Sequence, residues 1–306
     1  MVTTATQPET ATGPAGLQAL ARARHEIIPV SGGVAAARAL PRGTTITVTC
    51  SPRHGIETTV TTALSLAAEG YRAVPHIAAR LVPDRAYLED LLDRLAGHGL
   101  EEIFVVGGDA PRAAGPYTGG LELLRAIQNS RRPPRRIGVP AYPEPHATIP
   151  WHTLSQAFRA KNELADYAVT QICFEAETIT DWLTTERDAG LRLPVYLGMP
   201  GVVDRGKLLG LATRIGLGAS TRVLRRQGGL ASRLFGASTY RPDELIQRLL
   251  PAFDGPLGPS LAGLHFNTFN QVVATQAWLE ETLAALTPDE STAQQAQRPI
   301  MSPASS

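Results

Sequence analysis

The sequence predicts a single-domain α/β protein with the (β/α)8 TIM-barrel fold, in which eight parallel strands alternate with helices. Three observations support this prediction. The length of 306 residues is near the usual size of one such barrel. Eight short apolar runs rich in Val, Ile and Thr recur along the chain. From residue 44 to residue 193 the runs start about 26 to 34 residues apart, the length of one strand–helix repeat.

These apolar runs are the expected strands, since each has about four to eight residues of high β-propensity. They cover residues 26–30, 44–50, 73–78, 102–107, 136–141, 167–173, 193–198 and 261–267. Their near-continuous apolar character suits a parallel sheet that is covered on one face and filled on the other. An open doubly wound sheet is the alternative fold. It would usually carry a Gly-rich turn after its first strand, and the SGG at 31–33 is too short for one.

Amphipathic segments between the runs are the expected helices. Residues 84–96 place four leucines on one helical face and end at Gly97, a residue typical of helix C-termini. Further helices are expected at 151–164, 175–189, 204–214, 242–252 and 271–286. The barrel is expected over residues 25–286, with disordered tails at 1–24 and 287–306 because both ends are of low complexity.

Composition and charge exclude several classes of protein. Apolar residues make up 43% of the chain, which is enough to fill a core. Its 29 basic and 28 acidic residues give a net charge of +1, and the RRPPRR run at 131–136 is better explained as a solvated loop than as a nucleic-acid site. The sequence has no transmembrane stretch, signal-peptide pattern or cysteine framework. We therefore expect a cytoplasmic protein without nucleic-acid or membrane partners.

Several apolar runs end on a polar residue that can take part in chemistry. In a (β/α)8 barrel the active site is built at the carboxyl ends of the strands. The polar residues in these positions are Glu26, Thr49, His76, Asp109, Tyr142, Glu144, Gln171 and Asn267. The pattern thus predicts where the site lies before it indicates the reaction.

Two acidic residues are the candidate catalytic groups. A carboxylate at the end of a buried strand, such as Glu26, tends to have a raised pKa, which suits a general acid. The alternative is a glutamate that caps a helix or pairs with an arginine. Asp109 follows Gly107 and Gly108, which let the backbone approach a ligand. The alternative for Asp109 is a turn residue that caps a helix.

The histidines and glycines give no recognised cofactor motif. His76 lies in an apolar run, where a histidine is more often a core residue. His146, His152 and Glu144 lack the spacing of known metal sites, so no metal is expected. Because the dinucleotide, P-loop and GxSxG fingerprints do not occur, any phosphate or nucleotide must be held by loop amides and arginines.

Taken together and in order, the strand ends resemble the methylenetetrahydrofolate reductase family. The resemblance runs from about Glu26 to Asn270 and rests on six motifs. They are HEIIPV, TVTCS, VPHIAAR, VVGGDAP, AYPEPH and VTQICFE. The AYPExH and TQxxF patterns are the most specific pair.

The resemblance implies reduction of 5,10-methylenetetrahydrofolate to 5-methyltetrahydrofolate, in one-carbon metabolism and methionine biosynthesis. Glu26 matches the family's general acid, and Asp109 the aspartate that holds the folate and shapes the charge near the reacting centre. Gln171 matches the glutamine that hydrogen-bonds the pterin, and Asn267 is assigned to the substrate with it. The residues assigned to the cofactor are Thr49, His76, Gly108, Tyr142, His146 and Lys161.

The sequence departs from the family pattern at positions that the family uses to bind its cofactor. Gly107 stands where the family usually has an arginine, and Leu154 and Ala157 replace polar residues that grip the adenosine half of FAD. Each lost charged hydrogen bond costs about 1.5–3 kcal/mol. We hypothesise that FAD, expected from the family, is held weakly or not at all. NADH or NADPH would then pass its hydride directly to the folate.

Two other functions fit the same fold, because barrels host many unrelated reactions. One is a folate-binding or regulatory barrel without turnover. The other is a lyase or hydrolase that uses Glu26 and Asp109 as an acid–base pair. The sequence does not choose between NADH and NADPH, and it leaves the oligomeric state and the role of residues 222–233 open.

Overall fold

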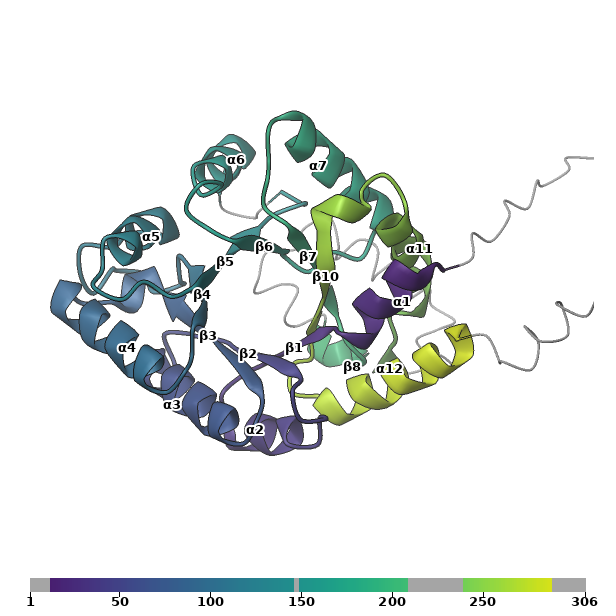
Figure 1. Cartoon of the computed structure of the whole chain (residues 1–306), viewed down its shortest axis with the longest axis horizontal. Helices are drawn as coiled ribbons and strands as arrows, with labels where there is room; N and C mark the ends of the chain where they lie inside the picture. Colours follow the sequence, from purple (N-terminus) through teal and green to yellow (C-terminus); the bar gives the residue numbers. More distant parts are fainter. Residues whose placement is uncertain (1–11, 146–148, 209–238, 288–306) are drawn as a thin grey trace, which may run out of the picture.

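The structure is a computed structural model that describes residues 12–145, 149–208 and 239–287. Eight parallel strands close into one barrel in the order β1-β2-β3-β4-β5-β6-β7-β10, and helices surround it (Figure 1). The predicted (β/α)8 barrel is therefore confirmed. Its strands are β1 (Arg24–Ile27), β2 (Thr45–Val48), β3 (Arg72–Ala78), β4 (Glu102–Val106), β5 (Arg136–Ala141), β6 (Tyr167–Thr170), β7 (Val195–Pro200) and β10 (Leu261–Asn267).

The helices cover the outward faces of the strands, where Ile27, Ile46 and Val105 are fully buried in the main core. The helix expected at 84–96 is α4 (Arg85–Gly97), with its four leucines buried and Asp84 capping the backbone N–H of Tyr87 at 2.8 Å. The surrounding helices are α2 (Ser31–Ala37), α3 (Gly55–Ala68), α4 (Arg85–Gly97), α5 (Gly120–Gln128), α6 (Trp151–Arg159), α7 (Ala176–Asp188), α11 (Asp243–Asp254) and α12 (Val272–Leu286).

A separate apolar layer fills the middle of the barrel. Its buried members are Val74, Phe104, Tyr167 and Val169. Tyr167 lies so close to β5 that a Cβ on Gly138 would come 2.2 Å from the tyrosine ring, so only glycine fits there. Because inward-facing residues alternate along each strand, polar side chains on either side of this layer occupy opposite ends of the barrel.

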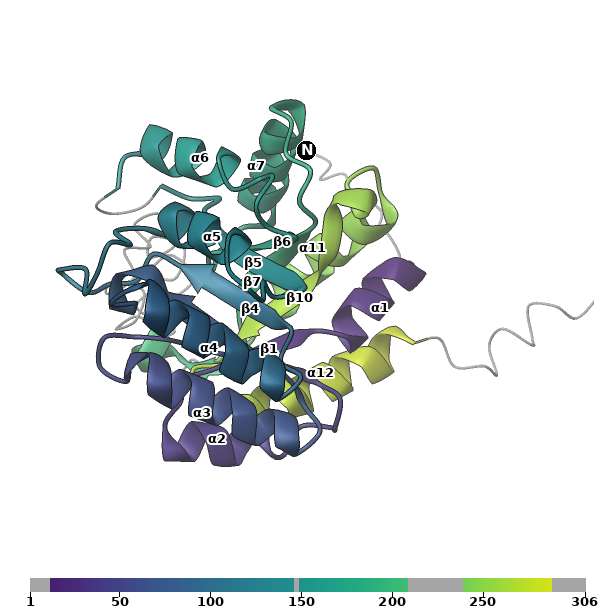
Figure 2. The same ribbon diagram turned by 60° about the vertical axis from the view of Figure 1, so that its left-hand side comes forward.

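The prediction of a disordered tail over residues 1–24 is wrong for its second half. Residues 14–21 form helix α1 (Pro14–Ala21), which lies beside α11 and α12 (Figure 2). The backbone N–H groups of Ala15 and Gly16 each donate to the carboxylate of Asp254 at 3.0 Å. This cap and the packing order the helix, and β1 begins at Arg24. Residues 1–11 and 288–306 lie outside the described residues.

The long connection after β7 carries a short antiparallel pair, β8 (Val203–Asp204) and β9 (Thr239–Tyr240), before α11. The helix expected at 242–252 is confirmed as α11. Most of the helix expected at 204–214, and all of 222–233, lie outside the described residues. Within the described ranges, no helix is long and apolar enough to span a membrane.

A buried histidine on the outer face of β1 gives a testable prediction about stability. Burial lowers the pKa of His25 to about 4, and neither ring nitrogen has a hydrogen-bond partner among the described residues. Unfolding exposes the ring and restores its ordinary pKa, so the unfolded chain binds the extra proton first as pH falls. Stability should therefore be lost between pH 6.5 and 4, by on the order of 2–3 kcal/mol from this group.

The His25→Leu variant should lose that part of the pH dependence. Urea unfolding at several pH values measures the free energy of unfolding for wild type and variant. His152→Leu, at an exposed position on α6, is the control and should keep the wild-type slope. An unchanged slope in His25→Leu would contradict the prediction.

Candidate active site

Glu26 is the centre of a polar cluster at the carboxyl end of the barrel. Its Oε1 accepts a hydrogen bond from Nδ2 of Asn267 at 2.6 Å. Its Oε2 lies 3.3 Å from Nε2 of His265 and 3.7 Å from Nε2 of His76. The three partners come from β10 and β3, on either side of β1 and β2 in the barrel. Closure of the barrel, and not proximity in sequence, therefore brings these three side chains to one carboxylate.

This environment shifts the pKa of Glu26 in the direction opposite to the one expected from the sequence. Burial alone raises the pKa, but the hydrogen bond from His265, the electrostatic effect of both histidines and the hydrogen bond from Asn267 outweigh it. The net pKa lies below the ordinary value, so the expectation of a raised pKa is wrong for the ligand-free protein. The ionised form of Glu26 is therefore favoured in the ligand-free protein.

His76 is a buried and neutral partner of this carboxylate. Burial lowers its pKa to about 4, and its ring packs against Phe104 at a centroid distance of 4.7 Å. One edge of the ring packs in the interior, as expected of a core histidine, and its Nε2 faces the Glu26 carboxylate. No hydrogen-bond partner of its Nε2 is present among the described residues.

His265 is the residue of this cluster that the sequence analysis missed. It is buried on β10, two positions before Asn267, so both side chains face the same side of the strand. In sequence it is one more histidine in an apolar run. It could have been identified because it stands two residues before Asn267 on the same strand, and Asn267 was already assigned to the site.

Asp109 lies exposed in the loop after β4, on the same mouth as Glu26. Gly108 precedes it with φ +90°, and a Cβ there would meet the Cβ of Ala78 at 3.0 Å, so glycine is required on both counts. The Asp109 charge adds to burial in raising the pKa of Tyr142, the residue after β5. The Asp109 carboxylate therefore lies close enough to Tyr142 to act on it electrostatically.

Arg80 fixes the loop that carries Asp109. Its Nε donates to the carbonyl of Ala110 at 2.6 Å, and its two terminal nitrogens donate to the carbonyls of Pro111 at 2.9 Å and Thr118 at 3.1 Å. Its backbone N–H donates to Gly107 at 3.0 Å. The sequence analysis quoted this arginine in VPHIAAR without assigning it a role, because its acceptors are main-chain atoms at least 27 residues away, a relation no motif encodes.

Two of the remaining predicted residues, Thr49 and Gln171, lie at strand ends around the same mouth. Thr49 follows β2 and donates its N–H to Ile27 at 3.0 Å, and Gln171 follows β6 and donates its N–H to Ala141 at 2.7 Å. Lys161 is buried beside Gly120 at the start of α5, and burial lowers its pKa. No carboxylate pairs with it within the described ranges. His146 lies outside the described residues.

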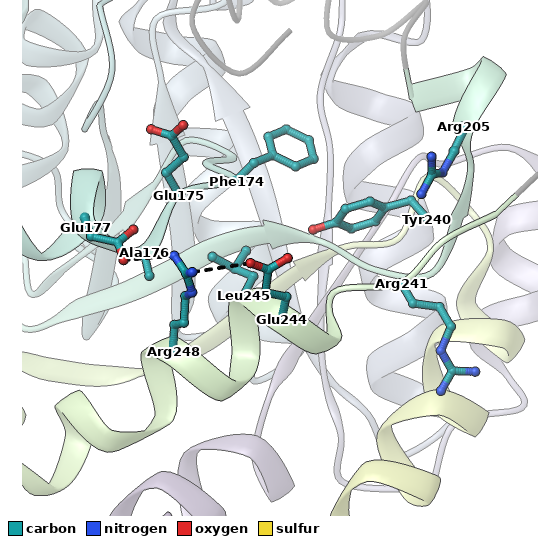
Figure 3. Close-up of a pocket in the computed structure, with 10 residues that line it drawn as sticks. All are labelled: Phe174, Glu175, Ala176, Glu177, Arg205, Tyr240, Arg241, Glu244, Leu245 and Arg248. Carbon is teal, nitrogen blue, oxygen red and sulfur yellow. Dashed lines mark hydrogen bonds and ion pairs between the residues drawn. The ribbon is translucent and has the colours of Figure 1, made fainter. Parts of the chain in front are cut away.

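A pocket of about 230 Å³ lies beside the mouth, between the starts of α7 and α11 and strand β9 (Figure 3). It holds none of the predicted site residues. Its charges are largely paired, as Arg248 contacts both Glu177 at 3.0 Å and Glu244 at 3.4 Å. Among the described residues no group of three or more His, Cys, Asp or Glu side chains could hold a metal ion.

The fold and the polar mouth define a (β/α)8 barrel with an acidic candidate active site at the carboxyl ends of its strands. The chain belongs to the methylenetetrahydrofolate reductase family, whose model matches residues 35–208, more than half of its length. The matched segment includes Asp109 and Gln171. Glu26 and Asn267 lie outside it and join the site through the barrel closure.

Known proteins show similarity at low identity. Methylenetetrahydrofolate reductase 2 of Saccharomyces cerevisiae is 26% identical over 141 residues, 42% of this chain and 23% of that protein, so the match spans less than a quarter of the relative. A 2,3-dimethylmalate lyase structure is 10% identical with a TM-score of 0.46, over 94% of this chain and 90% of that one. A deoxyribose-phosphate aldolase structure (described as "putative") from Toxoplasma gondii is 13% identical with a TM-score of 0.45, over 87% and 97%.

The role of Arg80 in holding the Asp109 loop can be tested by hydrogen exchange. In Arg80→Ala the backbone amides of the non-proline residues from 110 to 118 should exchange at least about ten-fold faster, because hydrogen bonds from a charged donor worth about 1.5–3 kcal/mol each are lost. Arg125→Ala, at an exposed position on α5, is the control. Equal exchange in this loop in wild type and Arg80→Ala would show that Arg80 does not order it.

Proposed function

We propose that the protein reduces 5,10-methylenetetrahydrofolate to 5-methyltetrahydrofolate with NADH or NADPH as the reductant. Membership of the methylenetetrahydrofolate reductase family supports a reaction of folate one-carbon units. The observation that carries the proposal for this chain is the Glu26 carboxylate, held at the barrel mouth by Asn267 and His265. A positioned carboxyl group is what the ring-opening step needs.

In the proposed reaction, Glu26 transfers a proton to the bridging nitrogen of the folate. The bond between that nitrogen and the methylene carbon breaks, and an iminium ion forms at the other nitrogen. A hydride from the nicotinamide reduces the methylene carbon to a methyl group, and NAD(P)⁺ leaves. Water returns a proton to Glu26, so one hydride and one proton are consumed in each turnover. His265 and Asn267 stabilise the Glu26 carboxylate that remains after proton transfer.

The other residues of the mouth would bind and orient the reactants. Asp109, held by its loop beside Tyr142, would contact the folate and balance charge near the iminium ion. Gln171, half-buried after β6, would hydrogen-bond the pterin ring. Lys161 provides a buried cation near the N-terminus of α5, which suits a phosphate of the nicotinamide dinucleotide.

Residues near the mouth fit a tightly held FAD poorly. Gly107 offers no side chain where the family pattern has an arginine. The hydroxyl and N–H of Thr118 are both bonded to the Glu122 carboxylate, and the side chain of Leu154 is buried on the inner face of α6. These features support direct hydride transfer from NAD(P)H to the folate, and no step is assigned to a flavin.

The proposal predicts an active enzyme without a flavin spectrum. Purified protein should show no absorption near 450 nm, yet oxidise NADH or NADPH when methylenetetrahydrofolate is added. In Glu26→Gln the rate should fall by about 10²–10⁴-fold, since the acid is lost, while Glu163→Gln, at an exposed position, should keep wild-type activity. A stoichiometric amount of bound flavin would refute direct hydride transfer from NAD(P)H, but it would leave the proposed reductase activity intact. No oxidation with or without added FAD would refute the reductase itself.

The contact between His265 and Glu26 predicts a change in the pH profile. Loss of the His265 hydrogen bond in His265→Leu removes an interaction that favours the ionised carboxylate, so the pKa of Glu26 rises. Because the acid acts in its protonated form, the alkaline limb of kcat/KM should move to higher pH. In His265→Gln the amide can still donate to Oε2 of Glu26, so the alkaline limb should move less than in His265→Leu. A lower rate with an unmoved limb in both variants would mean that His265 is only structural.

A further inference from the structure

We infer that the amino-terminal end of the barrel, opposite the candidate active site, holds a binding site for a small anion of the phosphate or phosphomonoester class. A cavity of about 350 Å³ opens there between helix α1, the strands and the segment before β10. This volume is within the range of small-molecule sites. Neither the family resemblance nor the proposed reaction assigns a role to this end of the barrel.

Positive charge dominates the lining of this cavity. Four arginines line it, with one carboxylate, and the charged residues are Arg22, Arg24, Arg72, Arg136 and Glu102. Glu102 is shared, since its Oε1 lies 2.6 Å from Arg24 and its Oε2 lies 3.4 Å from Arg136. Arg22 and Arg72 have no ion pair within the described ranges. Four guanidinium charges therefore share a single carboxylate, which leaves a net charge of +3 among the residues that line the cavity.

The inner part of the site is closely packed and hydrogen-bonded. Arg24 is only 2% exposed, and its guanidinium lies 4.1 Å from the ring centre of Tyr196 and 4.6 Å from that of Tyr167. One terminal nitrogen of Arg24 donates to the hydroxyl of Tyr167 at 3.0 Å, and one of Arg136 donates to the hydroxyl of Tyr196 at 3.1 Å. An anion would thus meet side chains already fixed in place, which lowers the entropic cost of binding.

The backbone of β10 is shaped to keep Tyr196 against Arg24. Gly263 has φ +148°, and the ladder between β10 and β7 shifts its register between Leu261 and Gly263. A Cβ on Gly263 would come 3.1 Å from the Tyr196 ring. A bulge and a glycine at one point of an otherwise regular strand are features typical of a local functional constraint.

A purely structural cluster would pair its charges, because like charges in a concave, partly dry surface repel each other. Here Arg24 and Arg136 share Glu102, while Arg22 and Arg72 are exposed at the edge of the cavity. An oxyanion with two negative charges would supply the missing counter-charge, and planar guanidinium groups suit its oxygens. Chloride is less suited, because it offers a single charge and no array of acceptor atoms.

Thermal unfolding and isothermal titration of the full chain test the site, with inorganic phosphate and glycerol 3-phosphate as probes and sodium chloride added to equalise ionic strength. Both probes should raise the Tm relative to chloride alone, since a ligand that binds the folded state stabilises it. The double variant Arg22→Gln/Arg72→Gln alters exposed side chains only, so it should fold. Its Kd for the probes should rise at least ten-fold.

The control is Arg192→Gln, an exposed arginine in the loop before β7 that does not line the cavity; its Kd should match wild type. Tighter binding of glycerol 3-phosphate than of phosphate identifies an esterified ligand, and equal or weaker binding identifies free phosphate. Wild-type protein without stabilisation beyond chloride, or a double variant with an unchanged Kd, would overturn the inference. Neither result depends on the reductase assay, so the two proposals fail separately.

Discussion

Closure of the barrel between its first and last strands is the constraint on which the candidate site depends. The pairing of β1 with β10 sets Glu26 opposite Asn267, although 241 residues separate them in sequence. His265, two positions earlier on β10, then reaches the same carboxylate. A shift of one residue in this register would turn both β10 side chains to the outer face. The strand register therefore determines the surroundings of the proposed acid.

The two ends of the barrel interior carry different chemistry because an apolar layer separates them. Val74, Phe104, Tyr167 and Val169 fill the middle, with Glu26 and its histidines beyond one side and Arg24 and Glu102 beyond the other. Tyr167 belongs to both parts, since its ring packs in the layer and its hydroxyl accepts from Arg24. One small fold can thus carry the proposed reaction at one mouth and the inferred anion site at the other, without shared catalytic groups.

Local patterns made the barrel and most strand-end residues predictable. A strand is short and apolar, and the residue after it must stand at the mouth, so Asp109, Tyr142 and Gln171 could be placed from sequence alone. Helix α1 could not, because its stabilising cap comes from Asp254, 238 residues after Gly16. Arg80 was missed for a similar reason: its acceptors are carbonyl groups of a distant loop, which carry no residue identity for a sequence pattern to show.

Residues close together in the chain were enough to predict the number and order of the barrel strands, the acidic residues at their ends and the resemblance to one family. The electrostatics of the site, in contrast, could be read only from the folded protein. A buried carboxylate suggests a raised pKa, but donors from β10 and the influence of β3 bring that of Glu26 below its ordinary value. The four arginines of the opposite cavity likewise come from three separate parts of the sequence. Charge interactions depend on distance in space, and folding sets that distance.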